Sequence, residues 1–454
     1  MAGTYRYTTL ALTISTAILL SACGKQDEAV APEAQSNIET SAKTQQSGAA
    51  LQAPATESVN QQDVAANYAD LAYATYQDSL TSAQALDQAV DKLLAEPTDA
   101  NLNAAKQAWL QARIPYQQSE VFRFGNAVVD DWEGQLNAWP LDEGLIDYVA
   151  SDDYQHELGN EGATANLIAN KSITIGGETL DASELTPKLL ADLNEVGGSE
   201  ANVATGYHAI EFLLWGQDLN GFEAGAGQRP VTDYAQGENC THGNCDRRAS
   251  YLDAVTDLLV DDLQWMVKQW SADESGNYRA ELLALPPQAV FQKMLFGMGS
   301  LSLGELAGER MKVALEANSY EDEHDCFSDN THNSHYYNGK GIQNVFLGSY
   351  KRLDGSVVSG PSLSALLHEQ NPELEQELRA DLEQSMQALN VLKETAEGTP
   401  AMTFDMMIAP GNEQGAKIIK AAINALAQQT GSIEKAAAQL GIESLEPDDA
   451  GHSF

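Results

Sequence analysis

Long stretches with helical periodicity restrict the fold of this chain more than any other feature of its sequence. Residues 62–94 and 99–125 carry apolar side chains at i, i+3 and i+4, the spacing of one helix face. The same pattern returns in six later stretches, which are residues 183–194, 199–215, 246–271, 288–317, 371–396 and 411–429. Runs of this length are typical of helical bundles rather than sheets. We therefore expect an all-α protein.

Two short segments alternate with a period of two instead. Ile173–Leu180 surrounds the pair Gly176-Gly177, and Arg352–Val358 surrounds Asp354-Gly355. Alternation on both sides of such a pair predicts a β-hairpin. We expect both hairpins to be small decorations on loops between helices.

The length of 454 residues favours more than one domain, because single hydrophobic cores stop growing at about 250–300 residues. A Gly-rich stretch at residues 220–237 is the predicted boundary. We expect one helical bundle over residues 61–225, a second over 226–440, and a tail at 441–454. Residues 120–125 and 305–310 each place a Glu and an Arg on a long helix before a polar loop, which leaves a duplication open.

The first 23 residues have the layout of a secretory signal. Arg6 precedes an apolar stretch from Leu10 to Leu20, which is shorter than the roughly 20 residues that span a bilayer. The tetrapeptide Leu20-Ser21-Ala22-Cys23 resembles a bacterial lipobox. This resemblance implies a lipoprotein signal peptide at residues 1–23, lipid attachment at Cys23 and, with Gly24 after it, the outer membrane, facing the periplasm or the cell surface. The alternative is ordinary signal cleavage with Cys23 incidental.

Residues 24–60 are rich in Ala, Gln, Ser, Thr, Glu and Pro and show no periodicity. We expect a disordered linker there, between the lipid anchor and the helical body.

The charge balance excludes some partners. The chain has 66 acidic and 25 basic side chains, a formal net charge of −41. Nucleic acid is bound largely through Lys and Arg that neutralise phosphates, so we expect no nucleic-acid partner. Anionic lipid surfaces are disfavoured for the same reason, which leaves the lipid anchor as the expected contact with a membrane. Most of the acidic excess falls in the helical body, where we expect a solvated surface.

Cys240 and Cys245 lie close enough in sequence to form a disulfide across a tight loop. A secreted chain enters a compartment where disulfides form, which favours this pairing. The alternative is a metal site that uses His242, although no second Cys/His cluster with zinc spacing lies nearby.

Gly206-x-His208-x-x-Glu211 is the most informative motif. On a helix, His208 and Glu211 project from the same face, where an imidazole and a carboxylate can supply two ligands to a transition metal. The alternative is a buried histidine that hydrogen-bonds its own glutamate, and the spacing alone slightly favours this structural pair.

The same motif resembles that of the imelysin family, bacterial envelope proteins named after an insulin-cleaving peptidase. Further stretches similar to the family, the last two resembling its iron-regulated protein A subgroup, are Arg113–Gly125, Asn137–Glu143, Asp147-Tyr148, Gly304–Met311 and His324–His332. The resemblance covers most of the chain, from about residue 65 to 430. The resemblance implies an all-helical body of two bundles, with the motif near their interface, and a role in iron uptake.

Any further metal ligands would have to come from elsewhere in the chain, and the acids in these matched stretches are the candidates. Glu120 is the first choice and Asp142 the second, with Glu143 and Asp147 also available. Arg113 and Arg123 would pair these carboxylates, hold an anionic ligand, or form purely structural ion pairs. Carboxylates with one imidazole suit iron best, although zinc, manganese and calcium would also fit.

A second polar cluster follows the helix predicted at 288–317. Glu305 and Glu309 lie one turn apart and repel each other when both are ionised, which favours a nearby cation, a proton or Arg310. The loop beyond adds four polar side chains: His324, Ser328, Asp329 and His332. We expect a second ligand-binding locus or an ordered loop, and no catalytic triad, because the sequence has no nucleophile elbow there.

Three functions remain at this point. The leading prediction is a lipid-anchored, non-enzymatic component of iron uptake that binds iron or an iron complex between two helical bundles. A metallopeptidase that uses His208 and Glu211 is the first alternative, although neither H-E-x-x-H nor H-x-x-E-H occurs. A scaffold that docks another envelope protein without any metal is the second.

Overall fold

The computed structural model describes residues 58–150, 154–452 and 454. Residues 57–454 form one compact unit. The predicted signal peptide with Cys23, and the predicted linker up to residue 57, lie outside the described residues. Within the described ranges, no helix is both long and apolar enough to cross a membrane.

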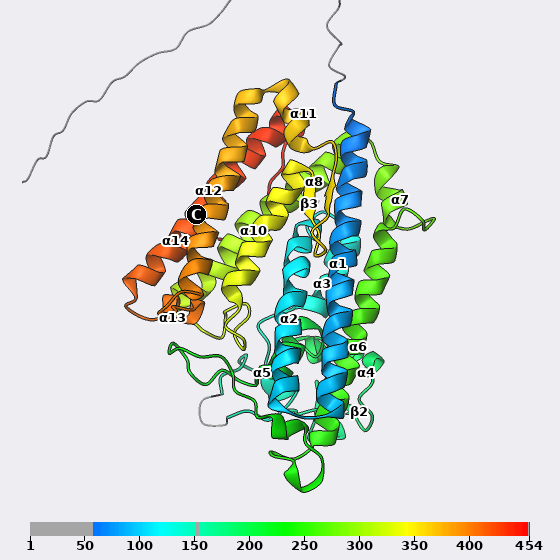
Figure 1. The fold of residues 1–454 in the computed structure, drawn as a ribbon, viewed down its shortest axis with the longest axis vertical. Coiled ribbons are helices and arrows are strands. Elements are labelled where there is room, and N and C mark those ends of the chain that lie inside the picture. The colour runs from blue at the N-terminus through cyan, green and yellow to red at the C-terminus, as the bar shows by residue number, and fades with distance from the viewer. Residues whose placement is uncertain (1–57, 151–153, 453) are drawn as a thin grey trace, which may run out of the picture. The chain divides into compact units, whose positions relative to one another are not determined.

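The fold is all-α with small hairpin decorations, which confirms the predicted fold class (Figure 1). The α-helices are α1 (Gln61–Ala95), α2 (Asp99–Ser119), α3 (Ala127–Asn137), α4 (Pro187–Leu193), α5 (Gly206–Trp215), α6 (Cys245–Trp270), α7 (Tyr278–Leu283), α8 (Pro287–Ser300), α9 (Ala314–Ala317), α10 (Thr331–Leu347), α11 (Leu363–Gln370), α12 (Pro372–Ala396), α13 (Phe404–Ile408) and α14 (Glu413–Gln439).

Short turns of 3₁₀-helix and one π-helix connect or extend these helices. The 3₁₀ turns are η1 (Glu120–Phe122), η2 (Glu143–Leu145), η3 (Val196–Gly198), η4 (Val231–Tyr234) and η5 (Gly237–Asn239). The π-helix is η6 (Leu301–Val313), which continues α8 without a break. In a π-helix the residues at i and i+5 share a backbone hydrogen bond, so side chains five apart become neighbours.

Both predicted hairpins are present as antiparallel strand pairs. β1 (Ser172–Ile175) pairs with β2 (Glu178–Asp181), with Ile173 opposite Leu180. β3 (Ser349–Lys351) pairs with β4 (Val357–Ser359), with Tyr350 opposite Val358. Each hairpin forms its own two-stranded sheet.

The long helices pack side by side in Figure 1. α1 packs against α2 and α6, while α12 packs against α14, which also packs against η6. α10 contacts both α2 and α12 and so connects these two sets of helices. Because residues 57–454 form a single unit, the boundary between residues 225 and 226 stays a prediction.

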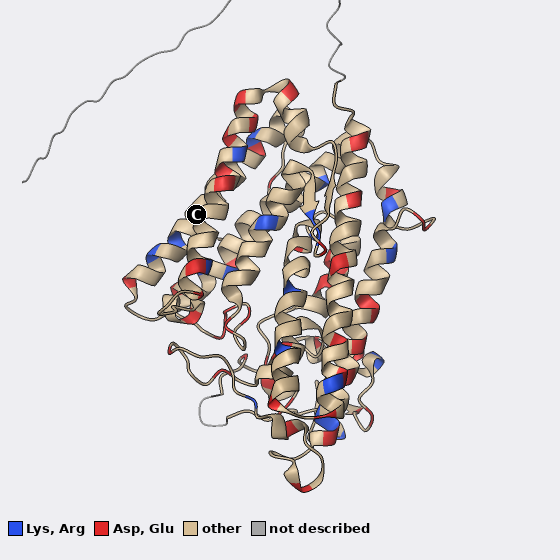
Figure 2. Ribbon diagram, viewed as in Figure 1, with Lys and Arg blue, Asp and Glu red and all other residues tan. Residues whose placement is uncertain are grey.

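Acidic residues are spread over the helices of the described body, and Lys and Arg are sparser (Figure 2). This distribution agrees with an acidic, solvated surface on the helical body. A smaller set of carboxylates is buried instead, among them the side chains of Glu211 and Asp325.

Two element boundaries differ from the periodicity. The helix expected at 199–215 begins only at Gly206, whose φ of +77° breaks the helix backbone before that residue. His332 was expected in the loop that follows the helix at 288–317, but α10 begins at Thr331 and contains it. The buried face of α10 is largely polar, so it lacks the apolar stripe that marks the other helices.

Candidate metal centre

Helix α5 places the predicted motif deep inside the protein, because each of its ten residues is buried. Its first residue, Gly206, has a φ of +77°, and a Cβ there would lie 2.3 Å from the carbonyl oxygen of Leu136 in α3. Only glycine fits this position. Trp109 of α2 donates from Nε1 to the carbonyl oxygen of Tyr207 at 2.9 Å. These contacts fix the start of the helix that carries His208.

Glu211 connects His208 to a distant loop. The Nδ1 atom of His208 lies 2.9 Å from Oε2 of Glu211. The other carboxylate oxygen, Oε1, accepts hydrogen bonds from Ser328 N at 3.0 Å and Ser328 Oγ at 2.6 Å. Ser328 belongs to residues 318–330, the loop between α9 and α10. The Nε2 atom of His208 has no hydrogen-bond partner among the described residues, although the side chain is buried.

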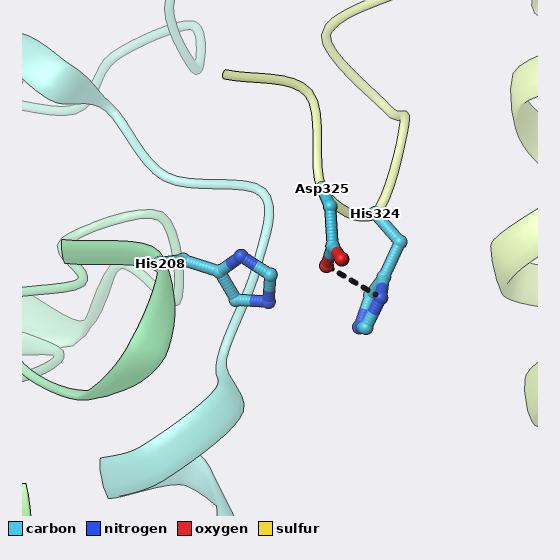
Figure 3. A group of neighbouring side chains, drawn as sticks. All are labelled: His208, His324 and Asp325. Carbon is cyan, nitrogen blue, oxygen red and sulfur yellow. Dashed lines mark ion pairs between the residues drawn. The ribbon is translucent and has the colours of Figure 1, made fainter. Parts of the chain in front are cut away.

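The same loop brings His324 and Asp325 to His208 (Figure 3). Each of the three side chains offers a ligand atom, and these atoms all lie within 4.8 Å of one another. The imidazole rings of His208 and His324 meet edge to face with centroids 4.9 Å apart. Nδ1 of His324 lies 3.2 Å from Oδ1 of Asp325, but no hydrogen bond of proper geometry satisfies it.

Hydrogen bonds hold the Asp325 carboxylate in place. Arg113 of α2 donates from Nη2 to Oδ1 at 2.9 Å, and Asn330 donates from Nδ2 to Oδ2 at 2.9 Å. The Ser334 hydroxyl also donates to Oδ2. The second arm of Arg113 donates from Nη1 to Oδ1 of Asn137 at 2.6 Å. The carboxylate is therefore anchored from α2 and α10 together.

The charge states suit metal coordination. Burial lowers the pKa of His208 to about 3, and the nearby Arg113 guanidinium acts in the same direction. Burial likewise holds the pKa of His324 well below its usual value. Although burial opposes the ionisation of Asp325, the Arg113 guanidinium holds the pKa of this carboxyl well below its usual value. At neutral pH the site therefore presents two neutral imidazoles and one carboxylate.

Two imidazole nitrogens with one carboxylate oxygen form a donor set for first-row divalent metals, Fe(II) among them. Bonds of about 2.0–2.2 Å allow ligand atoms at most about 4.4 Å apart, so a small inward movement would close the site around an ion. The buried nitrogens of His208 and His324 that lack partners would gain a ligand bond in this way. The three residues therefore fit a metal ion.

A cavity of about 420 Å³ opens beside the two histidines. Trp139 forms part of its wall and packs edge to face on His324 with ring centroids 4.6 Å apart. The acidic residues that line the cavity are Asp142, Glu157, Glu200, Glu321, Asp322 and Glu323. No Lys or Arg is among the lining residues of the described chain. The cavity gives a cation an acidic approach to the histidines.

The model of the family described as Imelysin matches residues 72–433, most of the chain. The chain belongs to the imelysin family. It is 26% identical to the protein named iron-regulated protein A from Synechococcus elongatus, over 71% of this chain and 73% of that protein.

Two solved structures share the imelysin fold seen here. One, described as an iron-regulated protein A precursor from Parabacteroides distasonis, is 19% identical with a TM-score of 0.59, covering 85% of this chain and 97% of that one. The other, described as an imelysin-like protein from Psychrobacter arcticum, is 15% identical with a TM-score of 0.53, covering 87% of this chain and 99% of that one. At these identities the likeness concerns the fold.

The other predicted ligands of this imelysin lie close to the centre but outside the group of three. Glu120 forms an ion pair with Arg310 and accepts from Asn137 Nδ2 at 3.3 Å. Asp142 lines the cavity, where it accepts from the backbone N of Glu157 at 3.0 Å and from Asn160 Nδ2 at 2.6 Å. Both carboxylates are thus engaged by the protein.

The two acids of the predicted second cluster, Glu305 and Glu309, both lie on η6 and pair with different partners. Arg310 lies five residues after Glu305 and donates from Nε to its Oε1 at 3.0 Å, the pairing that a π-helix favours. Arg123 Nη1 lies 3.6 Å from the other oxygen of Glu305. Glu309 lies 3.0 Å from Nε2 of His452 instead. Arg310 therefore compensates Glu305, one of the alternatives that the sequence left open.

The remaining predicted residues are more dispersed. Asp147 lies in a buried ion cluster 2.7 Å from Arg229 and 2.6 Å from Arg248. His332 lies in the first turn of α10, near Asn333, rather than in a loop. Asp329 has a φ of +56° and belongs to the 318–330 loop.

The structure joins Cys240 to Cys245 by a disulfide. His242 is the histidine of the alternative metal site. Its Nδ1 atom lies 2.7 Å from Oδ1 of Asp233.

Sequence reasoning did not single out Asp325 as a candidate ligand and assigned His324 to a second polar cluster. The available signal was the stretch His324–His332, which resembles the family and begins with two adjacent donor residues. The spacing in sequence could not show that this loop returns to α5. The contact between Ser328 and Glu211 establishes that return.

Proposed function

We propose that this imelysin-family protein binds iron through His208, His324 and Asp325 and acts in bacterial iron uptake at the cell envelope. The observation that carries the proposal is the convergence of three buried ligand atoms within 4.8 Å, two of them on imidazoles with an unsatisfied nitrogen. The name of the Synechococcus relative, iron-regulated protein A, supports iron as the metal.

The residues around the three ligands have separate roles in this proposal. Glu211 accepts from Nδ1 of His208 and so turns Nε2 toward the metal, as carboxylates beside metal-bound histidines commonly do. Arg113 holds Asp325 in place. The acidic cavity next to Trp139 admits a hydrated ion or a small cationic complex.

We favour metal binding over peptide hydrolysis. A metallopeptidase needs a general base that reaches a metal-bound water. Both carboxylate oxygens of Glu211 already contact protein groups, Oε2 at His208 and Oε1 at Ser328. Glu211 is therefore placed to orient His208 rather than to activate water.

Attachment to the outer membrane through lipid on Cys23 completes the proposal. Its support is the lipobox-like tetrapeptide Leu20-Ser21-Ala22-Cys23. Acyl chains on one cysteine would keep the metal site at the membrane surface, since each buried methylene adds about 0.8 kcal/mol to binding. Mass spectrometry of the N-terminal peptide from membranes would show the acylated Cys23, and an unmodified thiol there would contradict this part.

Metal binding is tested by calorimetric titration of the purified, metal-free protein with Fe(II) under anaerobic conditions, and with Zn(II). We expect one ion per chain, lost in His208→Ala and in His324→Ala. His332→Ala is the matched control, because His332 lies in the nearby α10 but outside the group of three.

Circular dichroism of each variant establishes that the fold is intact. Retention of Fe(II) binding by both folded alanine variants would overturn the proposal. Loss of binding in His332→Ala alone would place the metal elsewhere. Peptide hydrolysis is measured on the same metal-loaded samples. Turnover there would show that the protein is a metallopeptidase rather than a non-enzymatic metal-binding protein.

A further inference from the structure

Arg310 is a buried cation to which the proposed function gives no role. It lies on the π-helix η6 and is 0% exposed. All three of its nitrogens donate, to four acceptors: Oε1 of Glu305, Oε2 of Glu120, Oδ1 of Asn338 and Oε1 of Gln117. These acceptors belong to η6, η1, α10 and α2, so four elements together fix the plane of the guanidinium.

The π-helix makes one of these pairs possible. Glu305 and Arg310 are five residues apart, and Nη2 of Arg310 donates to Oε1 of Glu305 at 2.7 Å. An α-helix brings together residues three or four apart, whereas a π-helix brings together residues five apart. The orientation of Arg310 therefore depends on the π register of η6.

The first route from Arg310 to the metal centre is a stack of side chains. The guanidinium carbon of Arg310 lies over the ring of Trp139, 5.2 Å from its centroid. Trp139 in turn packs edge to face on His324, with ring centroids 4.6 Å apart and planes at 83°. Nε1 of Trp139 is buried and has no hydrogen-bond partner among the described residues, so packing alone positions this ring. The place of the His324 ring is thus tied to that of the guanidinium.

A second route reaches the same histidine through hydrogen bonds. Glu120, which forms an ion pair with Arg310, accepts from Nδ2 of Asn137 at 3.3 Å. That Nδ2 atom lies 3.5 Å from Nε2 of His324. Oδ1 of Asn137 accepts from Nη1 of Arg113 at 2.6 Å. The arginine that holds the carboxylate ligand of the centre is therefore joined to the same network.

We propose that Arg310 is a positioning residue of the metal centre, which holds the His324 imidazole in place through the Trp139 stack and through these hydrogen bonds. This inference rests on the proposed function. A metal site needs its ligands held within about 0.5 Å of the binding geometry, which requires supporting side chains that are themselves fixed. A planar guanidinium can serve four acceptors while it lies over an indole, and an ammonium group cannot.

The test measures the Zn(II) affinity by calorimetry and the visible absorption bands of bound Co(II), which report the number and geometry of the ligands. Arg310→Lys keeps the charge but loses the planar set of donors. We expect it to weaken Zn(II) binding about 10–100-fold, as loss of groups that support metal ligands commonly does, and to shift the Co(II) bands. A role in folding alone would lower the Tm and leave the affinity and the bands unchanged, and that result would overturn the inference.

Two variants of Trp139 keep the inference testable if Arg310→Lys does not fold. Trp139→Leu removes the ring between Arg310 and His324, so it should shift the Co(II) bands and weaken Zn(II) binding about tenfold or more. Trp139→Phe restores an aromatic ring and should recover most of the affinity that Trp139→Leu loses. Equal affinities in the two folded variants would contradict the stack as a route to His324.

Arg352→Lys is the matched control. Arg352 of the β3–β4 hairpin donates from Nε and Nη2 to Oδ1 of the buried Asp78, at 3.0 and 2.7 Å. We expect a lower Tm with unchanged Zn(II) affinity and Co(II) bands. Equal loss of affinity in Arg352→Lys and Arg310→Lys would overturn the inference, because general destabilisation would then explain both. Failure of the unsubstituted protein to bind Zn(II) or Co(II) would instead remove the proposed function, and this inference with it.

Discussion

The rings of His208 and His324 meet edge to face with their centroids 4.9 Å apart, although one belongs to α5 and the other to the loop before α10. Each ring is buried and keeps one nitrogen without a hydrogen bond. Unsatisfied buried polar atoms are rare and costly in folded proteins. Their pairing beside Asp325 therefore indicates a site built for a ligand, and it guides the predictions that follow.

Replacement of Glu211 by Gln should weaken transition-metal binding without unfolding the protein. Gln retains the size and one oxygen, but its amide nitrogen cannot replace the second carboxyl oxygen, so contacts with His208 Nδ1 and with Ser328 cannot both be kept. Loss of such a partner to a metal-bound histidine typically costs about 10–100-fold in affinity. Calorimetric titration with Zn(II) measures the change, and an affinity equal to that of the unmodified protein would refute an orienting role.

Replacement of Arg113 by Met should destabilise the metal-free protein by about 3–5 kcal/mol, because Asp325 would keep a buried charge without its partner. Saturating Zn(II) should recover part of this loss, since a cation at Asp325 replaces the guanidinium. Denaturant unfolding with and without Zn(II) measures both effects.

Arg279→Met is the matched control for Arg113→Met. Arg279 pairs with Asp70, whose side chain is 51% exposed, so we expect a loss below about 1 kcal/mol and no dependence on Zn(II). Equal losses in the free energy of unfolding of the two variants would contradict the prediction that Arg113 compensates a buried charge on Asp325.

Replacement of Gly206 by Ala should destabilise the protein. The φ of +77° alone costs a non-glycine residue about 1–3 kcal/mol, and the added Cβ would lie 2.3 Å from Leu136 O. Gly431→Ala in α14 is the control, because its Cβ meets nothing within 4 Å. There we expect a gain of about 0.4–1 kcal/mol. Thermal unfolding of the pair tests the prediction, which a neutral Gly206→Ala would disprove.

The stability of the metal-free protein should fall as the pH rises from 7 to 8.5. Burial raises the pKa of Glu143 to about 8 and that of Glu133 to about 7, both above the usual 4.5. The folded state then binds more protons than the unfolded chain between pH 4.5 and 8, so stability is lost across that window as pH rises. The buried His208, with a pKa of about 3, is neutral in both states above pH 7 and adds nothing there.

Differential scanning calorimetry in EDTA measures this pH dependence, and we expect the Tm to fall by roughly 2–4 °C. Glu143→Gln removes one of the groups that titrate and should make the fall smaller. A Tm that rises between pH 7 and 8.5 would be inconsistent with protonated carboxyls in the interior.

Local patterns in the sequence were sufficient for much of the fold. Apolar spacing over residues 62–94 predicted α1, and alternation around Gly176-Gly177 predicted the β1–β2 hairpin. The i, i+3 spacing of His208 and Glu211 placed both side chains on one face of α5. These features depend on residues a few positions apart, whose geometry is set by the backbone itself.

Only the tertiary structure decided which groups complete the centre. Asp325 and His324 reach His208 because Ser328 bonds Glu211 and Arg113 holds Asp325, contacts between segments far apart in the chain. The polar buried face of α10 escaped detection for the same reason. Its partners are hydrogen-bonding groups on other helices, such as Gln117 for Asn338, so no apolar repeat marks it. Periodicity reports where a segment buries apolar surface, whereas a site of polar groups is defined by which segments the packing brings together.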